Sequence, residues 1–176
     1  IPPFVNETLY NLHIPGMKIM RWQKRKNRYL HPKLYPWLSV ATTGTHDTTP
    51  MALWWNEISV AERDAFLSML NKGNVLSPET PSIPPDDKAG QLIWLSALAS
   101  ASSMIAILPF QDILGLSDKI NQPGTISEKN WCYRMPENID SLCDHPLWKN
   151  KLDFLKTAIV QYDRAGKPSL VRLCGL

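Results

Sequence analysis

The sequence has no long hydrophobic run and little net charge, and each absence excludes a class of partner. No apolar stretch approaches the roughly 20 residues that a membrane-spanning helix needs, so we expect no membrane association. The net charge is only +3 in 176 residues. The one basic cluster, between Lys18 and Lys33, is interpreted as a solvated loop because no recognition module carries it. We therefore expect no nucleic-acid partner.

Cysteine is also scarce. Cys132, Cys143 and Cys174 are odd in number and lack the spacing of metal ligands. We expect free thiols in a reducing compartment, and hence a cytoplasmic location. We also expect no cofactor.

Tryptophan and proline, in contrast, are abundant, at 7 and 15 residues. Flat aromatic rings with a polar edge suit sugars, although several of these rings must also pack in a core. A non-catalytic, aromatic-rich carbohydrate-binding domain is therefore one hypothesis for function. Pro78, Pro81, Pro84 and Pro85 lie close together in an irregular segment, 75–88, where they block regular structure.

Three short stretches predict β-strands: 17–22, 38–45 and 104–108. The second and third are predicted to be buried, and the second, LSVATTGT, is typical of a strand covered on both faces of a parallel sheet. Helix signals lie between and around these strands. They predict helices from Pro2 to about Leu12, from a Ser59–Glu62 capping box to Gly73, after Asp86 or Asp87, as a short turn within 111–116, and from Pro146 to Gly166.

This order of elements predicts an α/β fold, because each pair of strands is separated by enough chain for a crossover. Three strands alone would leave two unpaired edges, so the pattern is typical of part of a larger closed sheet. We predict the C-terminal portion of a (β/α)8 TIM barrel, with about three parallel strands and surrounding helices. The chain begins Ile1-Pro2-Pro3 without Met, so we expect a processed product or a fragment.

His46 and Asp47 stand side by side where the second predicted strand ends. Chemistry in barrels gathers beyond the carboxyl ends of the strands, so this pair is the first candidate for an active site. A metal-dependent hydrolase that also uses His31 is a second hypothesis. A metal would need more ligands than these, so we expect no metal site. A Ser-His-Asp mechanism is disfavoured because the chain has no nucleophile elbow.

The segments around this pair resemble the C-terminal half of the 4-alpha-glucanotransferases, the amylomaltases or disproportionating enzymes. The matching stretches follow in family order: IPGMKI (14–19), GTHDTT (44–49) with Trp54-Trp55, PFQDILGL (109–116), INQPGT (120–125) and NW (130–131). The resemblance implies that 1–176 form the C-terminal part of a glycoside-hydrolase-type catalytic barrel. It implies α-1,4-glucans and maltooligosaccharides as substrates, with glucose as an acceptor. Gln111 and Asp112 are interpreted as a helix start with a structural role.

The resemblance also implies roles for individual residues. Asp47 corresponds to the third catalytic carboxylate, which holds sugar hydroxyls in the donor subsite, and His46 binds the same ring. Asn121 matches a position that lines the active cleft, and Trp22 a position near the acceptor sugar.

The family reaction is a retaining double displacement, in which a glucan segment is moved to a new 4-position of an acceptor glucose or glucan. The family's nucleophile Asp and acid/base Glu follow its fourth and fifth strands, and both positions would precede Ile1. We therefore expect these 176 residues to be inactive on their own, because one carboxylate cannot act as both nucleophile and proton donor.

Overall fold

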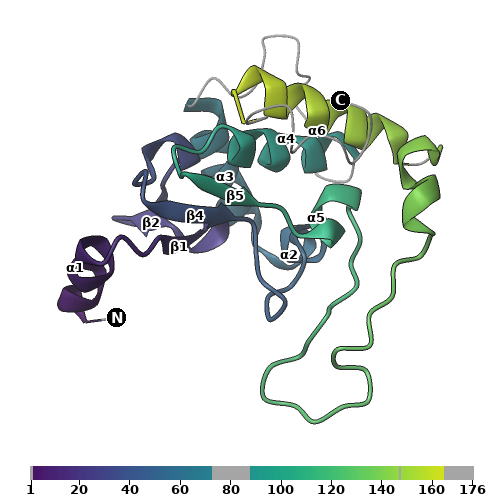
Figure 1. Cartoon of the computed structure of the whole chain (residues 1–176), viewed down its shortest axis with the longest axis horizontal. Helices are drawn as coiled ribbons and strands as arrows, with labels where there is room; N and C mark the ends of the chain where they lie inside the picture. Colours follow the sequence, from purple (N-terminus) through teal and green to yellow (C-terminus); the bar gives the residue numbers. More distant parts are fainter. Residues whose placement is uncertain (1, 73–87, 147, 165–176) are drawn as a thin grey trace.

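A small parallel sheet organises the chain. The computed structural model describes residues 2–72, 88–146 and 148–164 (Figure 1). In it, β1 (Gly16–Ile19), β4 (Ser39–Thr42) and β5 (Ile105–Ile107) lie side by side in the order β1-β4-β5. Both pairs are parallel, with Met17 opposite Val40 and Ala41 opposite Ala106. The predicted α/β fold with three parallel strands is confirmed.

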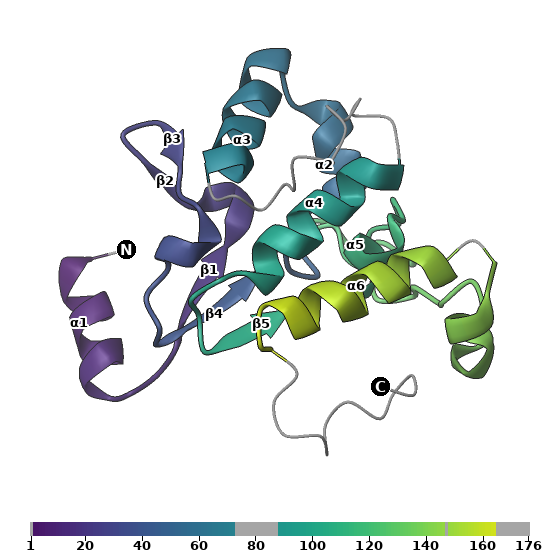
Figure 2. The same ribbon diagram turned by 90° about the horizontal axis from the view of Figure 1, so that it is seen from above.

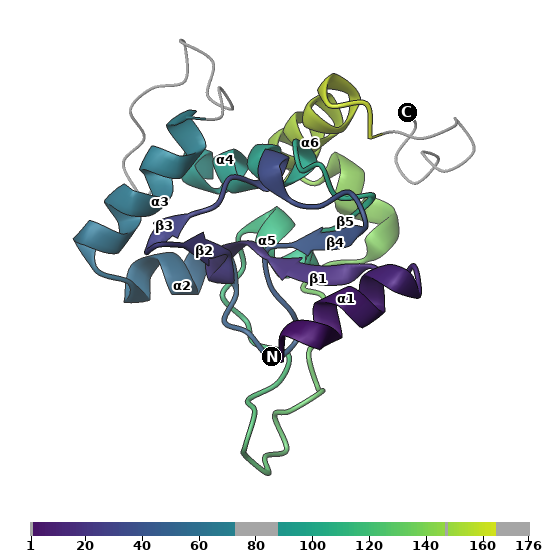
Figure 3. The same cartoon turned by 90° about the vertical axis from the view of Figure 1, so that its left-hand side faces the viewer.

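The remaining elements connect and cover these strands. A hairpin of β2 (Lys24–Arg25) and β3 (Arg28–Tyr29) lies between β1 and β4 in the chain. The helices α4 (Lys88–Ala99) and α6 (Lys149–Gln161) lie side by side on one side of the sheet (Figures 2 and 3). The helices are α1 (Pro3–Asn11), η1 (Met20–Trp22), η2 (Pro32–Leu34), α2 (Met51–Glu57), α3 (Val60–Lys72), α4 (Lys88–Ala99), α5 (Phe110–Leu114), η3 (Ile139–Asp144) and α6 (Lys149–Gln161).

Three strand predictions need correction. The second strand, predicted as 38–45, spans only Ser39–Thr42. The first strand ends at Ile19 and not at Trp22, because Gln23 N donates to Met20 O (3.3 Å) and closes the 3-10 turn of η1. The third strand is not buried: Ile105 and Ile107 expose 40% and 55% of their surface. They share one face of an edge strand, and within the described residues that edge has no further strand beside it.

The predicted helices match the observed helices to different degrees. α1 matches its prediction, with Pro2 as N-cap. α6 begins at Lys149, three residues after Pro146, and α2 was not predicted at all. The predicted segment 75–88 lies outside the described residues apart from Lys88, where α4 begins. The predicted helix start at Asp86 or Asp87 and the predicted helix ends at Gly73 and Gly166 also lie outside them. In the described part of the chain, no helix is both long and apolar enough to cross a membrane.

The predicted capping box at the start of α3 is only half formed. Glu62 N donates to Ser59 Oγ (3.2 Å), as a capping box requires. The Glu62 carboxylate, however, accepts from Tyr29 OH (2.6 Å) and Lys24 Nζ (2.7 Å) in the hairpin. Glu62 therefore ties α3 to the β2–β3 hairpin.

An aromatic cluster centred on Phe66 forms the main core. Phe66 is fully buried, and its ring centroid lies 5.0 Å from that of Tyr29, 5.3 Å from Trp54 and 6.0 Å from Trp55. Edge-to-face contacts of this kind add to the gain from burial. The cluster joins α2, α3 and the hairpin, the three elements that lie beside the carboxyl ends of β1 and β4.

We expect Phe66→Ala to destabilise the purified chain by about 3 to 5 kcal/mol, because it opens a cavity where three aromatic rings meet. Urea unfolding followed by tryptophan fluorescence measures this. Val60→Ala on the same helix is the matched control, since Val60 is 70% exposed and should shift stability by less than about 0.5 kcal/mol. Equal midpoints for the two variants would contradict the assignment of the core.

Candidate active site

A tight turn after β4 presents His46 and Asp47. Thr48 Oγ1 accepts from Thr45 N (2.8 Å) and donates to Thr45 O (3.0 Å), which closes the turn. A Cβ on Gly44 would clash with Thr48 Oγ1 unless the Thr48 side chain moved, so this close approach favours glycine there. The side chains of His46 and Asp47 remain about half exposed. Local hydrogen bonds thus hold the pair accessible at the carboxyl end of the sheet.

Three of the four predicted site residues meet here. His46 Nε2 lies 3.3 Å from Asp47 Oδ2. Asn121 Nδ2, from a segment far along the chain, donates to Asp47 Oδ1 (2.6 Å). Each carboxylate oxygen therefore faces one nitrogen, which orients the group without burying it. Segment 117–138, which supplies Asn121, extends to the same side of the sheet as the turn (Figures 1 and 3).

Trp131 is a further site residue to which sequence reasoning gave no role. Its ring centroid lies 4.8 Å from that of His46, with the ring planes at 43°. The residue is 61% exposed and has a φ of 63°, while its backbone N donates to Ile120 O (2.8 Å). Positive φ is uncommon for a bulky residue. The NW motif was the only sequence signal for it.

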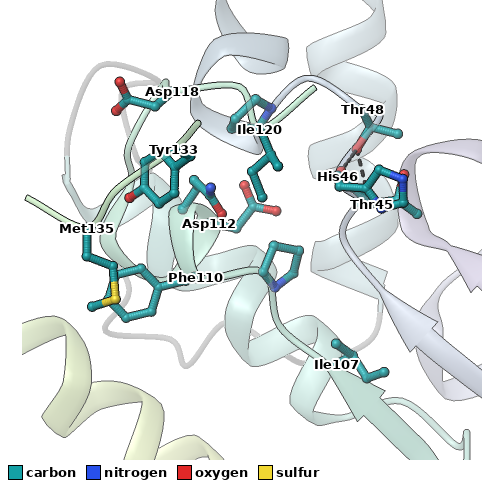
Figure 4. Close-up of a pocket in the computed structure, with 14 residues that line it drawn as sticks. Thr45, His46, Thr48, Ile107, Phe110, Asp112, Asp118, Ile120, Tyr133 and Met135 are labelled. Carbon is teal, nitrogen blue, oxygen red and sulfur yellow. Dashed lines mark hydrogen bonds between the residues drawn. The ribbon is translucent and has the colours of Figure 1, made fainter. Parts of the chain in front are cut away.

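A pocket of about 480 Å³ opens beside the turn. Thr45, His46 and Thr48 lie on one side of it, and Phe110 and Tyr133 lie on the other (Figure 4). Its walls are mainly apolar and its rim carries polar groups, a combination typical of small-molecule sites. Such walls suit the apolar face of a sugar ring, whose hydroxyls would meet the polar rim.

Trp22, the fourth predicted residue, lies at the same end of the sheet but apart from the cluster. It ends η1, directly after β1, and is 60% exposed. In the part of the chain that the structure describes, no hydrogen bond or ring contact joins it to His46 or Asp47. Because β1 neighbours β4, Trp22 flanks the turn without touching it.

Gln111 and Asp112 have the structural position that was predicted. Both are buried, in α5, which begins after Pro109. Asp112 Oδ1 accepts from Met51 N (2.7 Å) and so caps α2, while Oδ2 accepts from the Thr43 hydroxyl. This long-range cap explains why the sequence around Met51 carries no cap of its own.

His31 does not join the cluster. It is buried, and its Nδ1 accepts from Lys33 N (3.1 Å). The next residue, Pro32, accepts from Ser102 N, which precedes β5, so His31 lies at the amino end of the sheet. Across 2–72, 88–146 and 148–164, no group of three or more His, Cys, Asp or Glu side chains could hold a metal ion. The metal-dependent hydrolase hypothesis therefore lacks its third ligand.

Comparison with known proteins gives consistent results. A family model described as 4-alpha-glucanotransferase matches residues 1–140. The chain is 31% identical over 173 residues to a 4-alpha-glucanotransferase of Chlamydia pneumoniae, covering 90% of this chain and 31% of that protein. It is 32% identical over 158 residues to the Chlamydia muridarum protein of the same name, covering 82% and 28%. The chain thus spans less than a third of the length of these relatives.

Solved structures show the same fold. An amylomaltase from Streptococcus agalactiae in complex with acarbose superposes with a TM-score of 0.70 at 24% identity, over 93% of this chain and 30% of that one. The amylomaltase from Corynebacterium glutamicum gives a TM-score of 0.70 at 19% identity, over 90% and 27%. The predicted portion of a (β/α)8 barrel is confirmed.

The burial of His31 generates a pH prediction. Burial, helped by the positive charge of Lys33, lowers the pKa of His31 from 6.5 to about 4. At a pH between these two values, His31 binds a proton in the unfolded chain but not in the folded chain. Stability is therefore lost as the pH falls from about 6.5 towards 4.

We expect His31→Asn, which keeps an acceptor for Lys33 N, to reduce this acid-induced loss by up to about 3 kcal/mol. Urea unfolding at pH 7, 6, 5 and 4.5 measures it. The control is His13→Asn, an exposed position with a φ of 55° that asparagine tolerates. A pH dependence that His31→Asn leaves unchanged would show that another group is responsible.

Proposed function

This chain belongs to the 4-alpha-glucanotransferase family, and from that membership we propose that it is the C-terminal part of the catalytic barrel of such an enzyme. The proposed reaction moves a segment of an α-1,4-glucan to the 4-position of an acceptor glucose or glucan. The observation that carries this proposal is the cluster of His46, Asp47 and Asn121 beside an open pocket, with contacts of 3.3 and 2.6 Å to the two carboxylate oxygens.

The proposed mechanism is a retaining double displacement. A carboxylate nucleophile attacks the anomeric carbon while a carboxylic acid protonates the leaving oxygen, and the glucosyl-enzyme is then intercepted by a sugar hydroxyl. We assign both of these groups to the rest of the enzyme. Asp47 serves as the third carboxylate, which binds hydroxyls of the sugar that reacts.

The geometry of Asp47 suits that role. As the sugar flattens towards an oxocarbenium-like state, positive charge grows on the ring, and a fixed carboxylate nearby stabilises it. The contacts with His46 and Asn121 orient Asp47 before the sugar arrives, so little reorganisation is needed. His46, packed against Trp131 at 4.8 Å, supplies a further polar contact to the same ring.

We assign Trp22 to the acceptor side. Its exposed ring lies one strand away from the turn, at a position where a second sugar could stack beside the first. We also propose a cytoplasmic location, since Cys132 is an exposed free thiol, which suits a reducing compartment.

We expect Asp47→Asn in the complete enzyme to lower kcat for maltotriose disproportionation roughly a hundred- to a thousandfold. KM should change little, because the amide keeps the shape of the side chain and loses the charge that matters in the transition state. His46→Ala should cost less, since it removes one polar contact to the sugar and leaves the Asp47 carboxylate in place.

Circular dichroism checks that the Asp47→Asn protein is folded. Asp64→Asn, an exposed carboxylate on α3, is the matched control and should keep full activity. If Asp47→Asn retains more than about a tenth of kcat, Asp47 is not the third carboxylate. Glucan binding by a complete protein with no transfer at all would favour the alternative of a carbohydrate-binding domain.

Trp22→Ala should weaken transfer to a glucan acceptor more than it weakens hydrolysis, because water needs no aromatic platform. The expected difference is on the order of 1 kcal/mol, or about fivefold in rate. Trp37→Ala is the matched control: Trp37 is 68% exposed but precedes β4, at the opposite end of the sheet. Equal losses of transfer and hydrolysis in Trp22→Ala would assign Trp22 to folding.

A further inference from the structure

A buried polar network lies beneath the turn that carries His46 and Asp47, and the mechanism above does not use it. Arg21, Thr43 and Asp112 expose only 6%, 0% and 2% of their surface. Burying charged groups is costly unless their hydrogen bonds are well placed. The role of this network must therefore outweigh the cost of burying two charged side chains at this position.

Asp112 holds both ends of the turn with one carboxylate. The Thr43 hydroxyl donates to Asp112 Oδ2, and Met51 N donates to Oδ1 at 2.7 Å. Thr43 is the last residue before the turn and Met51 is the first residue of α2 after it. The carboxylate of Asp112 points to the side of the pocket that carries Thr45, His46 and Thr48 (Figure 4). Segment 44–50 is thus clamped to α5.

Arg21, in η1 directly after β1, also binds Thr43. Its Nε donates to Thr43 O (3.2 Å), so the carbonyl and the hydroxyl of one threonine are held by opposite charges. The guanidinium also lies over the ring of Trp54 in α2, 5.2 Å from its centroid. Burial raises the pKa of Asp112, and the hydrogen bonds from Thr43 and Met51 and the positive charge of Arg21 oppose that rise. Side chains from η1 and α5 therefore meet at Thr43, and both also contact α2.

Two different sets of contacts hold the turn. The network joins it to the elements around it, and hydrogen bonds within the turn set its conformation. Hydrogen bonds between Thr45 and Thr48 close the turn from within. Its placement relative to β1 and α5, and so to the pocket wall that includes Phe110, depends on Thr43 and Asp112. Loosening this clamp would displace an intact turn. A displacement of about 1 Å can cost roughly a hundredfold in rate.

We propose that Asp112, acting through Thr43 and with Arg21, is a positioning residue that sets where His46 and Asp47 meet the reacting sugar. This inference rests on the proposed function, because placement matters only if Asp47 acts on a sugar. The network is a determinant of turnover and not only of stability.

The test uses Thr43 and Asp112 variants of the complete enzyme. Thr43→Val keeps the shape but removes the hydroxyl donor, and Asp112→Asn cannot accept from Thr43 and Met51 in the same way. For both we expect kcat for maltotriose disproportionation to fall roughly ten- to a hundredfold, with KM within about threefold of wild type. Thr43→Ser restores the hydroxyl and should recover most of the lost kcat.

A core variant separates placement from stability. Met69→Ala, in the buried face of α3, should lower Tm at least as much as Thr43→Val but leave kcat of the folded enzyme near wild type. If Thr43→Val keeps kcat within twofold of Thr43→Ser, or loses no more than Met69→Ala does, the positioning role is wrong. Asp47→Asn, measured beside them, tests the proposed function separately: full activity there would overturn that function whatever the Thr43 variants do.

Discussion

Parallel pairing of β4 with both of its neighbours is the constraint on which the rest of this structure depends. Because all three strands run the same way, the residues that follow them emerge at one end of the sheet. Trp22 follows β1, His46 and Asp47 follow β4, and the long segment with Asn121 follows β5 and α5. Asp47 and Asn121, which are 74 positions apart in sequence, thereby become neighbours. An antiparallel arrangement of the same strands would place them at opposite ends.

The sequence predicts those parts of the fold that depend on local pattern. A run of small and β-branched residues was enough to place β4, and the proline pair was enough to begin α1. The third strand shows the limit of such reasoning. A run of apolar residues looks the same whether it faces a helix or an open sheet face, so the exposure of Ile105 and Ile107 could not be foreseen.

The candidate site divides in the same way. The His46–Asp47 pair could be located from the strand that precedes it. The contact between Asn121 and Asp47 could not be derived from any local pattern, and the resemblance to a family placed Asn121 only along the active cleft. The part played by Trp131 depends on a backbone with positive φ and on a hydrogen bond to Ile120, neither of which is written in composition. Abundant tryptophan was a mixed signal, because Trp55 and Trp94 are core residues.

The capping of α2 from a distant residue has a consequence for the order of folding. α2 has only seven residues, too few to persist as an isolated helix, and its first turn depends on a carboxylate 61 positions later in the chain. Closing so long a loop is entropically costly and slow compared with local helix formation. We therefore expect α3, with 13 residues, to form earlier than α2, whereas the turn with His46 and Asp47 becomes ordered only once α5 has docked. The candidate site is thus one of the last parts of the chain to form during folding.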